Sequence, residues 1–356
     1  MTDLPKHLPM QALTTFMRPR IGWGLVGAGG ISDQHVRALS YVPEARLVAV
    51  GSRDAAKARA FIDTPRGHEA IAEPVRAHGS YQALVDDPEV DVVYIGTPHP
   101  DHIGTMRLAI AAGKAVLCEK PFTLNRREAE AAVALARKRG VFLMEAMWMR
   151  YVPAMVELKR LLAQGAIGEL VSVSADFGFS CAGWPASHRA LAPELGGGGL
   201  LDIGVYPLNL AAFVLGDIVG VQADAALGPT GVDVHTVFHM RHAGGQRSQG
   251  MSSLRSATPC RATIVGTDGH IDVTPPFYAA QQLRVARGTR PWHEAPEEVI
   301  DKPWRGNRYV HQVEEVHRCL RAGLAESPVM PLDETVALVG WMDTMRAQFG
   351  LRYPGE

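Results

Sequence analysis

The residues that could do chemistry in this chain start with a glycine-rich run, Gly24-Leu25-Val26-Gly27-Ala28-Gly29-Gly30-Ile31-Ser32. The pattern predicts a hydrophobic strand, a glycine turn and then a helix from Ile31. Gly27 would permit the tight turn and Gly29 would let the backbone approach a phosphate, and Gly30 and Ile31 are also expected to bind the cofactor. The free N–H groups and the positive dipole end of the helix then favour the pyrophosphate of a dinucleotide. Taken alone, the run is also compatible with an ordinary strand-to-helix turn.

The next predicted strand, Arg46–Gly51, ends in Ser52-Arg53-Asp54, and these residues bear on the choice of cofactor. A site for NAD usually carries an acidic residue about twenty positions past the glycines, where it accepts from the ribose hydroxyls. Ser52 and Arg53 offer a hydroxyl and a guanidinium instead, and a guanidinium pairs well with a 2′-phosphate. We therefore expect NADP rather than NAD. The alternative is that Asp54 serves the ribose and Arg53 is solvated.

From Ile21 to about Glu145, short apolar strands alternate with helices, as a doubly wound parallel sheet requires. The further strands are predicted at Val92–Ile95, Ala115–Cys118 and Val141–Met144, and helices at about 102–112 and from an N-cap at Asn125 to Gly140. Ligands bind such sheets at the edge where the carboxyl ends of the strands meet. This edge carries Thr97, Pro98, His99, Glu119 and Lys120.

Three side chains could move protons. A cation such as Lys120 at the cofactor edge can hydrogen-bond a reacting hydroxyl and lower the pKa of a neighbouring acid; the alternative is a simple pair with Glu119. Asp202 and Tyr206 are four residues apart, which places both on one face of a helix. A free phenol has a pKa near ~10, so Tyr206 needs a positive charge nearby to act as a base. Otherwise it packs beside Pro207.

Past Met147 the pattern changes to one helix followed by alternating segments, which predicts a largely antiparallel sheet. The predicted helix is Pro153 to about Ala163, the strands include 170–177, 221–225, 232–240 and 262–265, and two closing helices are roughly 309–322 and 333–349. Residues on both faces of Val232–Met240 are apolar or weakly charged. One covered face cannot accommodate them all, so we expect a homodimer through this sheet.

Composition fits an enzyme with two cores, since 47% of the 356 residues are hydrophobic and 21% are charged. The net charge of −1 provides no basic field for nucleic acid or an anionic membrane. Four widely spaced cysteines suit thiols in a reducing compartment, so a cytoplasmic location is expected. We expect no membrane span, and no secretion signal in the arm at 1–20.

His235, His239 and His242 have the spacing of a helix face that could bind zinc. The residues between them alternate with the period of a strand. On a strand the three histidines would be spread along one face, too far apart for a tetrahedral site. We therefore expect no metal.

Several motifs occur together and in order: GAGGIS, GSRD, TPHPDH, EKPF, MEAMWMRY, ADFGF and GGGGLLDIGVYP. In this combination the chain resembles the Gfo/Idh/MocA oxidoreductases from about Ile21 to Tyr353. It is most similar to the branch of dimeric dihydrodiol dehydrogenase and NADP-dependent D-xylose 1-dehydrogenase. The resemblance implies an α/β fold with a Rossmann domain at 21–146 and, at 147–356, a substrate-binding and dimerisation domain with an open, mostly antiparallel sheet.

The resemblance also implies roles for individual residues. Lys120 matches the catalytic-site lysine of the family, and Tyr206 matches this branch where many relatives carry histidine. Positions tied to cofactor binding are matched by Thr97, Pro98, His99, His102, Glu119 and Lys120, and the pocket-lining region is matched by Trp148, Arg150 and Phe177. His102 could equally cap its helix, and the aromatic residues could be simple core.

The expected reaction is reversible hydride transfer between nicotinamide and a hydroxyl-bearing carbon. Tyr206 would take the hydroxyl proton with help from Lys120, and Asp202 would orient the substrate or the acid–base pair. Aldoses such as D-xylose, trans-dihydrodiols and related polyols fit the branch by analogy. Two alternatives are an inositol or keto-sugar oxidoreductase and a non-catalytic NADP(H)-sensing protein. A sensor would not need Lys120 and Tyr206 together.

Overall fold

The computed structural model describes residues 19–64, 74–288 and 296–356. Nearly all of the predicted arm at 1–20 lies outside the described residues. The chain forms two compact units, called here the first and the second unit. Each is described separately below.

Each of the two units is formed by two separate segments of the sequence. The first unit comprises Met1–Trp148 and Arg305–Val339, and the second comprises Met149–Trp304 and Gly340–Glu356. Within the first unit, Trp23 Nε1 donates to His317 Nε2 at 3.0 Å, and the Leu143 amide donates to the Ala325 carbonyl at 3.1 Å. The expected border at 146/147 lies near the end of the first segment, but it misses this return of the chain.

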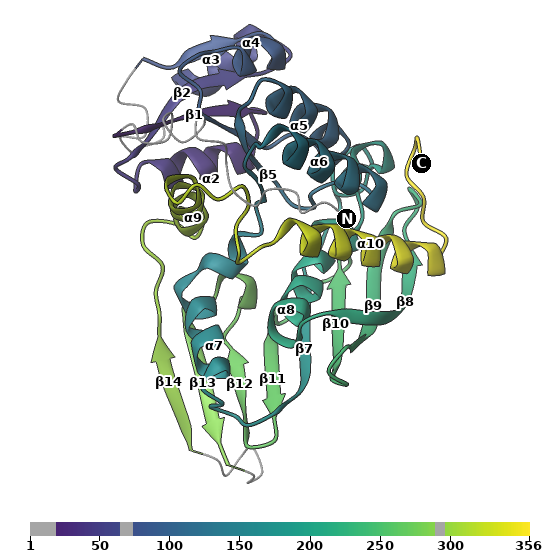
Figure 1. The fold of residues 1–356 in the computed structure, drawn as a ribbon. Helices are drawn as coiled ribbons and strands as arrows, with labels where there is room; N and C mark the ends of the chain where they lie inside the picture. Colours follow the sequence, from purple (N-terminus) through teal and green to yellow (C-terminus); the bar gives the residue numbers. More distant parts are fainter. Residues whose placement is uncertain (1–18, 65–73, 289–295) are drawn as a thin grey trace. The chain divides into compact units, whose positions relative to one another are not determined.

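The first unit contains a six-stranded sheet in the order β3-β2-β1-β4-β5-β6, of which Figure 1 labels β1, β2 and β5. Its strands are β1 Ile21–Val26, β2 Ala45–Gly51, β3 Arg76–His78, β4 Val92–Ile95, β5 Ala115–Cys118 and β6 Leu143–Glu145. All neighbours pair in parallel, and β1, β4 and β5 are buried along their whole length, as strands covered on both faces must be. The predicted doubly wound sheet is confirmed, although β6 begins at Leu143 rather than Val141.

Helices alternate with the strands of the first unit. They are α2 Gly30–Leu39, α3 Ala55–Asp63, α4 Tyr81–Val85, α5 His102–Ala111, α6 Arg126–Arg139 and, after the return of the chain, α9 Val310–Arg321. Of these, α2, α5 and α6 match predicted helices, whereas α3 and α4 were not predicted and the helix predicted at 309–322 was expected in the second domain. The predicted cap of α6 is confirmed, because Asn125 accepts from the Glu128 amide at 3.1 Å. Gly140 ends this helix with a φ of 61°, a conformation that favours glycine.

The second unit contains an eight-stranded sheet in the order β14-β13-β12-β11-β7-β10-β9-β8 (Figure 1). The strands are β7 Leu170–Gly178, β8 Ile218–Leu227, β9 Asp233–His242, β10 Arg247–Ser253, β11 Ala262–Gly266, β12 Gly269–Val273, β13 Gln282–Arg287 and β14 Glu297–Asp301. β7 and β10 pair in parallel and the other neighbours pair antiparallel. The mostly antiparallel sheet is confirmed. Four of its strands, β10 and β12 to β14, were not predicted, and β10 shows why: it reads RSQGMSS, with little apolar content.

Two helices of the second unit matter for the site. Helix α7, Pro153–Ala163, has the predicted bounds. Helix α8, Val205–Leu215, packs against β7 and β10, and all of its residues are buried. The expectation of no membrane-length apolar run is corrected here: Pro193–Leu215 is long and apolar enough by length and composition. Because 89% of its most apolar window is buried, it serves this fold as a core helix. The last helix, α10 Leu332–Gln348, runs from the first unit into the second.

Candidate active site

The glycine turn between β1 and α2 leaves a helix N-terminus open. Gly27 has a φ of 97°, and a Cβ there would lie 2.7 Å from the Gly96 carbonyl oxygen, so only glycine fits. A Cβ on Gly29 or Gly30 would meet nothing within 4 Å. Gly29 is the N-cap, and it offers the first amides of α2 no side-chain acceptor. The predicted turn is therefore present, and its open amides fit the pyrophosphate of a dinucleotide.

Two other helix starts along this sheet, those of α3 and α4, differ from that of α2. Asp54 caps α3 by accepting from the Ala56 amide at 2.8 Å, and Ser80 caps α4 by accepting from the Ala83 amide at 3.1 Å. The carboxylate of Asp54 is thus held by its own helix. Among these neighbours, the start of α2 is the one that leaves its amides to an outside anion.

Ser52 and Arg53 lie directly after β2 at the same edge. Ser52 is buried, and its amide donates to the His78 carbonyl at 3.1 Å, whereas Arg53 is exposed. Partial burial raises the pKa of Tyr81, and the charge of Arg53 acts in the opposite direction. Arg53 therefore lies within electrostatic reach of Tyr81. The sequence did not indicate Tyr81 as a neighbour of Arg53, because Tyr81 begins α4 and is separated from Arg53 by 28 positions in the chain.

Backbone hydrogen bonds hold three strand ends side by side at this edge. The Gly96 amide donates to the Val26 carbonyl at 2.9 Å, and the Glu119 amide donates to the Ile95 carbonyl at 3.0 Å. The glycine turn, the Thr97 loop and the Glu119-Lys120 segment are therefore neighbours. Thr97 is 8% exposed, and its Oγ1 has no hydrogen-bond partner among the described residues. Such an orphaned hydroxyl at the cofactor edge also fits a bound dinucleotide.

His102 contacts both the Thr97 loop and the segment that follows Lys120. It is fully buried, with Nε2 3.0 Å from the Thr97 carbonyl and Nδ1 3.0 Å from the Pro121 carbonyl. Burial lowers its pKa, and the surrounding carbonyls only partly oppose that effect. His102 therefore connects the Thr97 loop and the Pro121 segment through its two ring nitrogens. His99 is 8% exposed, and its ring centroid lies 5.8 Å from that of His102.

Glu119 and Lys120 follow β5, as predicted. Glu119 is 5% exposed, and its Oε1 accepts from the Tyr94 hydroxyl at 2.7 Å. Its other oxygen accepts from the backbone amide of Lys120 at 3.3 Å. Tyr94 stacks on His35 with ring centroids 3.8 Å apart. A buried hydrogen-bonded carboxylate thus sets the backbone from which Lys120 extends.

In the second unit, Asp202 and Tyr206 lie on consecutive helical turns. Asp202 belongs to a π-helical turn, Leu200–Gly204, that continues directly into α8, whose second residue is Tyr206. Single π turns inside helices occur often at functional sites. Asp202 is 4% exposed, and Arg189 Nη1 lies 3.3 Å from its Oδ1.

The ring of Tyr206 belongs to an aromatic cluster. Its centroid lies 5.5 Å from those of both Phe177 and Tyr278, and these two rings stack on each other at 4.1 Å. Phe177 was singled out from the sequence and does meet Tyr206. Tyr278 was missed, because a tyrosine one residue beyond the short segment Pro275-Pro276-Phe277 gives no spacing signal. Rings of this kind suit the face of a cyclic substrate.

The other two residues expected to line the pocket pack inside their own units. Trp148, in the first unit, is 2% exposed and lies between Arg308, 5.0 Å from its ring, and Tyr309, also 5.0 Å away. Arg150, in the second unit, is 2% exposed and donates to Asn209 Oδ1 at 2.6 Å. The contacts described give both residues a packing role, and their contact with substrate stays a prediction.

The three histidines of β9 are on a strand, as predicted, but they do not share one face. His239 is exposed and bonded to Gln222, whereas His242 is buried on the opposite face and bonded to Ser248 at 2.8 Å. Ligand atoms of His270, Asp272 and Glu297 lie within 4.8 Å of one another. Thr263 donates to Asp272, and Arg284 lies 3.4 Å from Glu297, so both carboxylates already have partners. We assign no metal to this group.

Comparison with known proteins agrees with this geometry. Residues 21–147 match the family described as "Oxidoreductase family, NAD-binding Rossmann fold", and residues 155–272 match "GFO/IDH/MocA C-terminal domain". Trans-1,2-dihydrobenzene-1,2-diol dehydrogenase of Mus musculus is 38% identical over 94% of this chain and 98% of its own length; the Homo sapiens protein of that name is 35% identical over 94% and 98%.

Solved structures share the fold. An NAD binding oxidoreductase from Klebsiella pneumoniae has a TM-score of 0.81 at 24% identity, covering 93% of this chain and 97% of its own. An aldose-aldose oxidoreductase from Caulobacter crescentus has a TM-score of 0.80 at 24% identity, covering 92% and 97%. The glycine turn, the Glu119-Lys120 segment and both family matches lead to one conclusion: this chain belongs to the Gfo/Idh/MocA family of oxidoreductases.

Proposed function

We propose that this protein is an NADP-dependent dehydrogenase that transfers hydride between nicotinamide and a hydroxyl-bearing carbon of a sugar or a cyclic diol. One observation carries the proposal. The open N-terminus of α2 and the Glu119-Lys120 segment lie at the same edge of one parallel sheet, with the Thr97 loop between them. That arrangement supports a dinucleotide bound at this edge, with Lys120 as the cation beside its reacting end.

The substrate class is inferred from the relatives and the aromatic cluster. The curated relatives are named for a trans-dihydrodiol of benzene, and one fold neighbour is named for aldoses. Phe177, Tyr206 and Tyr278 form a wall of rings in the second unit. Such a wall accepts the flat face of a cyclic diol or the C–H face of a sugar ring.

The chain's own residues would supply acid–base chemistry. When bound, the nicotinamide ring supplies a hydride acceptor or donor. Tyr206 takes the proton of the substrate hydroxyl during oxidation and returns it during reduction. The ammonium of Lys120 favours the phenolate form of Tyr206 and hydrogen-bonds the reacting oxygen. Asp202, held by Arg189, orients the substrate hydroxyl.

For the cofactor we propose NADP, with NAD as the alternative. Asp54, the carboxylate that could serve the ribose of NAD, is held by the Ala56 amide as the cap of α3. Arg53 is exposed at the end of β2, next to Tyr81. A guanidinium there favours a 2′-phosphate, which NADP has and NAD lacks. Fold neighbours include a 3-ketoreductase from Actinomadura kijaniata solved with NADP.

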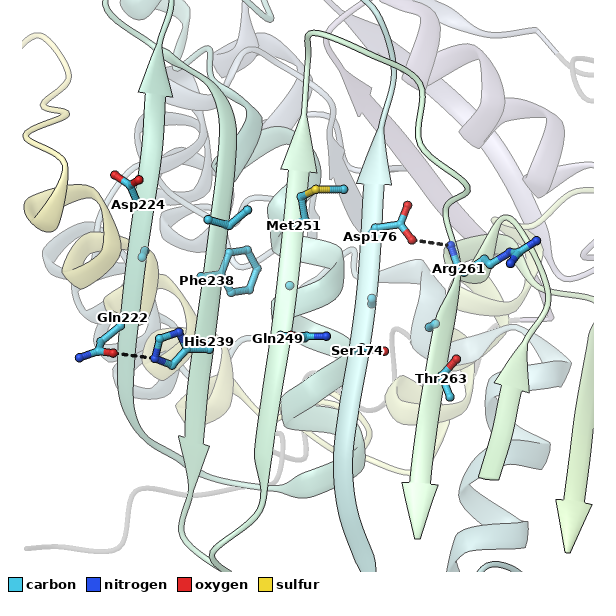
Figure 2. Close-up of a pocket in the computed structure, with 15 residues that line it drawn as sticks. Ser174, Asp176, Gln222, Asp224, Phe238, His239, Gln249, Met251, Arg261 and Thr263 are labelled. Atoms are coloured by element: carbon cyan, nitrogen blue, oxygen red, sulfur yellow. Dashed lines mark hydrogen bonds between the residues drawn. The ribbon is translucent and has the colours of Figure 1, made fainter. Parts of the chain in front are cut away.

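We further propose a homodimer through one face of the large sheet. That face holds a hollow of about 650 Å³, and Figure 2 shows polar side chains on five adjacent strands around it. Gln222, His239, Gln249, Ser174 and Thr263 stand in register across β8, β9, β10, β7 and β11. Val237 is 43% exposed beside this row. A second copy would cover both the apolar and the polar groups.

Light scattering at micromolar protein concentration tests the dimer. It should give a dimeric mass, and a monomer would contradict the proposed interface.

We also propose a cytoplasmic location. The four cysteines are free thiols, three of them buried, which supports a reducing compartment. Fractionation of the cells that express the protein should find it in the cytoplasm, and export would refute that location.

The catalytic proposal is tested by a screen of sugars and diols that follows NADPH absorbance. With the best substrate, Tyr206→Phe and Lys120→Met should each lower kcat about a hundredfold or more, while NADP still binds. The kcat of the double variant should be little lower than that of either single variant, because the two residues serve the same proton transfer. Full activity of Tyr206→Phe would refute the assignment.

A further inference from the structure

A second glycine-rich segment, Gly196–Gly199, precedes the helix that carries Asp202 and Tyr206, and a distant carboxylate completes its start. Gly199, the residue before the π turn, offers no side-chain cap. Instead, Asp233 at the start of β9 accepts from the Leu200 amide through Oδ2 at 2.6 Å. Asp233 is 0% exposed, and Thr236 Oγ1 donates to the same oxygen at 2.7 Å. The cap comes from 33 residues further along the chain.

The glycines make room for this carboxylate. A Cβ on Gly198 would lie 2.3 Å from Asp233 Oδ1, and one on Gly199 would lie 3.3 Å from Oδ2. Gly198 also has a φ of 121°, which L side chains rarely adopt. The loop and the carboxylate therefore fit each other closely.

Tyr353 holds the same loop from another side. Its hydroxyl donates to the Gly197 carbonyl at 2.6 Å, and the residue is 3% exposed. The guanidinium of Arg346 lies 4.9 Å from the ring of Tyr353 and forms ion pairs with Asp343 at 2.6 Å and Glu356 at 2.7 Å. These contacts fix the ring and aim its hydroxyl at the loop.

The loop is directly linked to the expected reacting residues. The amide of Asp202 donates to the Gly198 carbonyl at 3.3 Å. Leu200, which Asp233 holds, is two positions before Asp202 and six before Tyr206 in one continuous helical segment. A shift or rotation of this first turn would displace both side chains together. Displacements of about 1 Å are costly to a reaction that needs aligned groups.

We propose that Asp233 and Tyr353 are positioning residues, which set the first turn of the helix so that Asp202 and Tyr206 are aligned for hydride transfer. The inference rests on the proposed function, because it takes Tyr206 as the proton acceptor. Asp233 is 0% and Tyr353 is 3% exposed. They act through the backbone of Gly197, Gly198 and Leu200.

The test uses the full chain with Tyr353→Phe and Asp233→Asn. The first removes one hydroxyl; the second keeps the side-chain volume but weakens a charge-assisted bond. Each should lower kcat about tenfold, leave the Kd for NADPH within about twofold, and raise the primary deuterium isotope effect on kcat, because the chemical step becomes slower. Ser248→Ala is the matched control. Ser248 is buried and bonded to His242, which bonds the Gly216 carbonyl at the other end of α8, so kcat should stay unchanged.

The outcomes separate this inference from the proposed function. If Tyr206→Phe loses activity while Tyr353→Phe and Asp233→Asn keep wild-type kcat and isotope effect, the positioning role is wrong and the catalytic assignment stands. If Tyr206→Phe is fully active, the proposed function fails and the inference fails with it. In an Asp202→Asn, Tyr206→Phe background, Tyr353→Phe should cause no further loss of kcat; an independent tenfold loss would contradict an action through these two residues. Should Asp233→Asn fail to fold, Tyr353→Phe decides alone.

Discussion

Two helices in this chain begin after glycine-rich segments, and the two starts are completed in opposite ways. At α2, Gly29 and Gly30 face open space, and the helix amides have no side-chain cap. At the π turn before α8, Gly198 and Gly199 face the buried carboxylate of Asp233. The N-terminus of a helix favours an anion because of its free amides and its dipole. One anion would come with the cofactor, and the other belongs to the protein.

The difference shows what glycine does at each place. In the first unit it leaves open space at the start of the helix. In the second unit it makes space for a side chain from a distant strand. A glycine run alone therefore does not identify a phosphate site. The two runs are distinguished by the atoms that a Cβ added to each glycine would contact.

Gly198→Ala should produce the largest effect. The added methyl collides with Asp233 Oδ1, and φ at 121° is unfavourable for alanine, so the free energy of unfolding should fall by about 3 kcal/mol or more. Gly245→Ala is the matched control, because Gly245 has a φ of 91° but nothing within 4 Å of a Cβ. It should cost only about 1 kcal/mol. Equal losses in urea unfolding would show that Asp233 does not crowd the loop.

Gly29→Ala should weaken cofactor binding without lowering stability. Gly29 has extended backbone at φ −111°, which alanine adopts, so stability should be unchanged or higher by up to about 1 kcal/mol. The methyl would occupy space needed by the pyrophosphate, so NADP binding should weaken about a hundredfold. Fluorescence titration measures the affinity. Gly104→Ala, on exposed helix surface, is the control that should bind normally. Normal binding by Gly29→Ala would place the cofactor elsewhere.

Arg53→Ala should weaken NADP binding about ten- to a hundredfold, because a charge-assisted pair with a phosphate contributes about 1.5–3 kcal/mol. NAD binding should hardly change, since NAD has no phosphate there. Arg59→Ala removes another exposed arginine, from α3, and should affect neither cofactor. Equal small effects of Arg53→Ala on NADP and NAD would refute the NADP assignment.

The smallest expected effect is on the loss of folding stability at acidic pH. His35 on α2 is 1% exposed, neither ring nitrogen has a partner among the described residues, and burial lowers its pKa to about 3. The unfolded chain takes up a proton near pH 6.5 and the folded chain does not. The stability from neutral His35 is therefore complete above pH 6.5 and is lost as the pH falls toward 3, by about 1.4 kcal/mol per pH unit.

His35→Phe keeps a ring beside Tyr94 without a titrating group. Between pH 7 and 5.5, the variant should therefore lose about 1 kcal/mol less stability than the wild type. Urea unfolding at both pH values measures the difference. Identical losses in the two proteins would mean that His35 is not held neutral in the fold.

Much of the first unit was predictable, because buried parallel strands are short apolar runs and the helices between them have clear starts. The glycine turn, the cap at Asn125 and the strand end at Glu119 are all local signals. The return of residues 305–339 to the first unit was not predictable. It depends on distant contacts such as Trp23 with His317, which no spacing reveals.

The second unit was harder for the same reason. Strand β10 is polar, so its place between β7 and β9 comes from its partners rather than from its own pattern. Asp202 and Tyr206 could be found from their spacing. Tyr278, which stacks on Phe177, and Asp233, which caps Leu200, could not, because each meets the site from a remote part of the chain.

Transfer of deuterium tests the central claim most directly. A sugar or dihydrodiol identified by the screen, labelled on its reacting carbon, is incubated with NADP and the protein, and the cofactor is analysed by mass spectrometry. We predict one deuterium on the reduced nicotinamide with the wild-type protein, and with Tyr206→Phe about a hundredfold slower transfer although NADP is bound. Product formation without label in the cofactor, or transfer by Tyr206→Phe at the wild-type rate, would contradict the account.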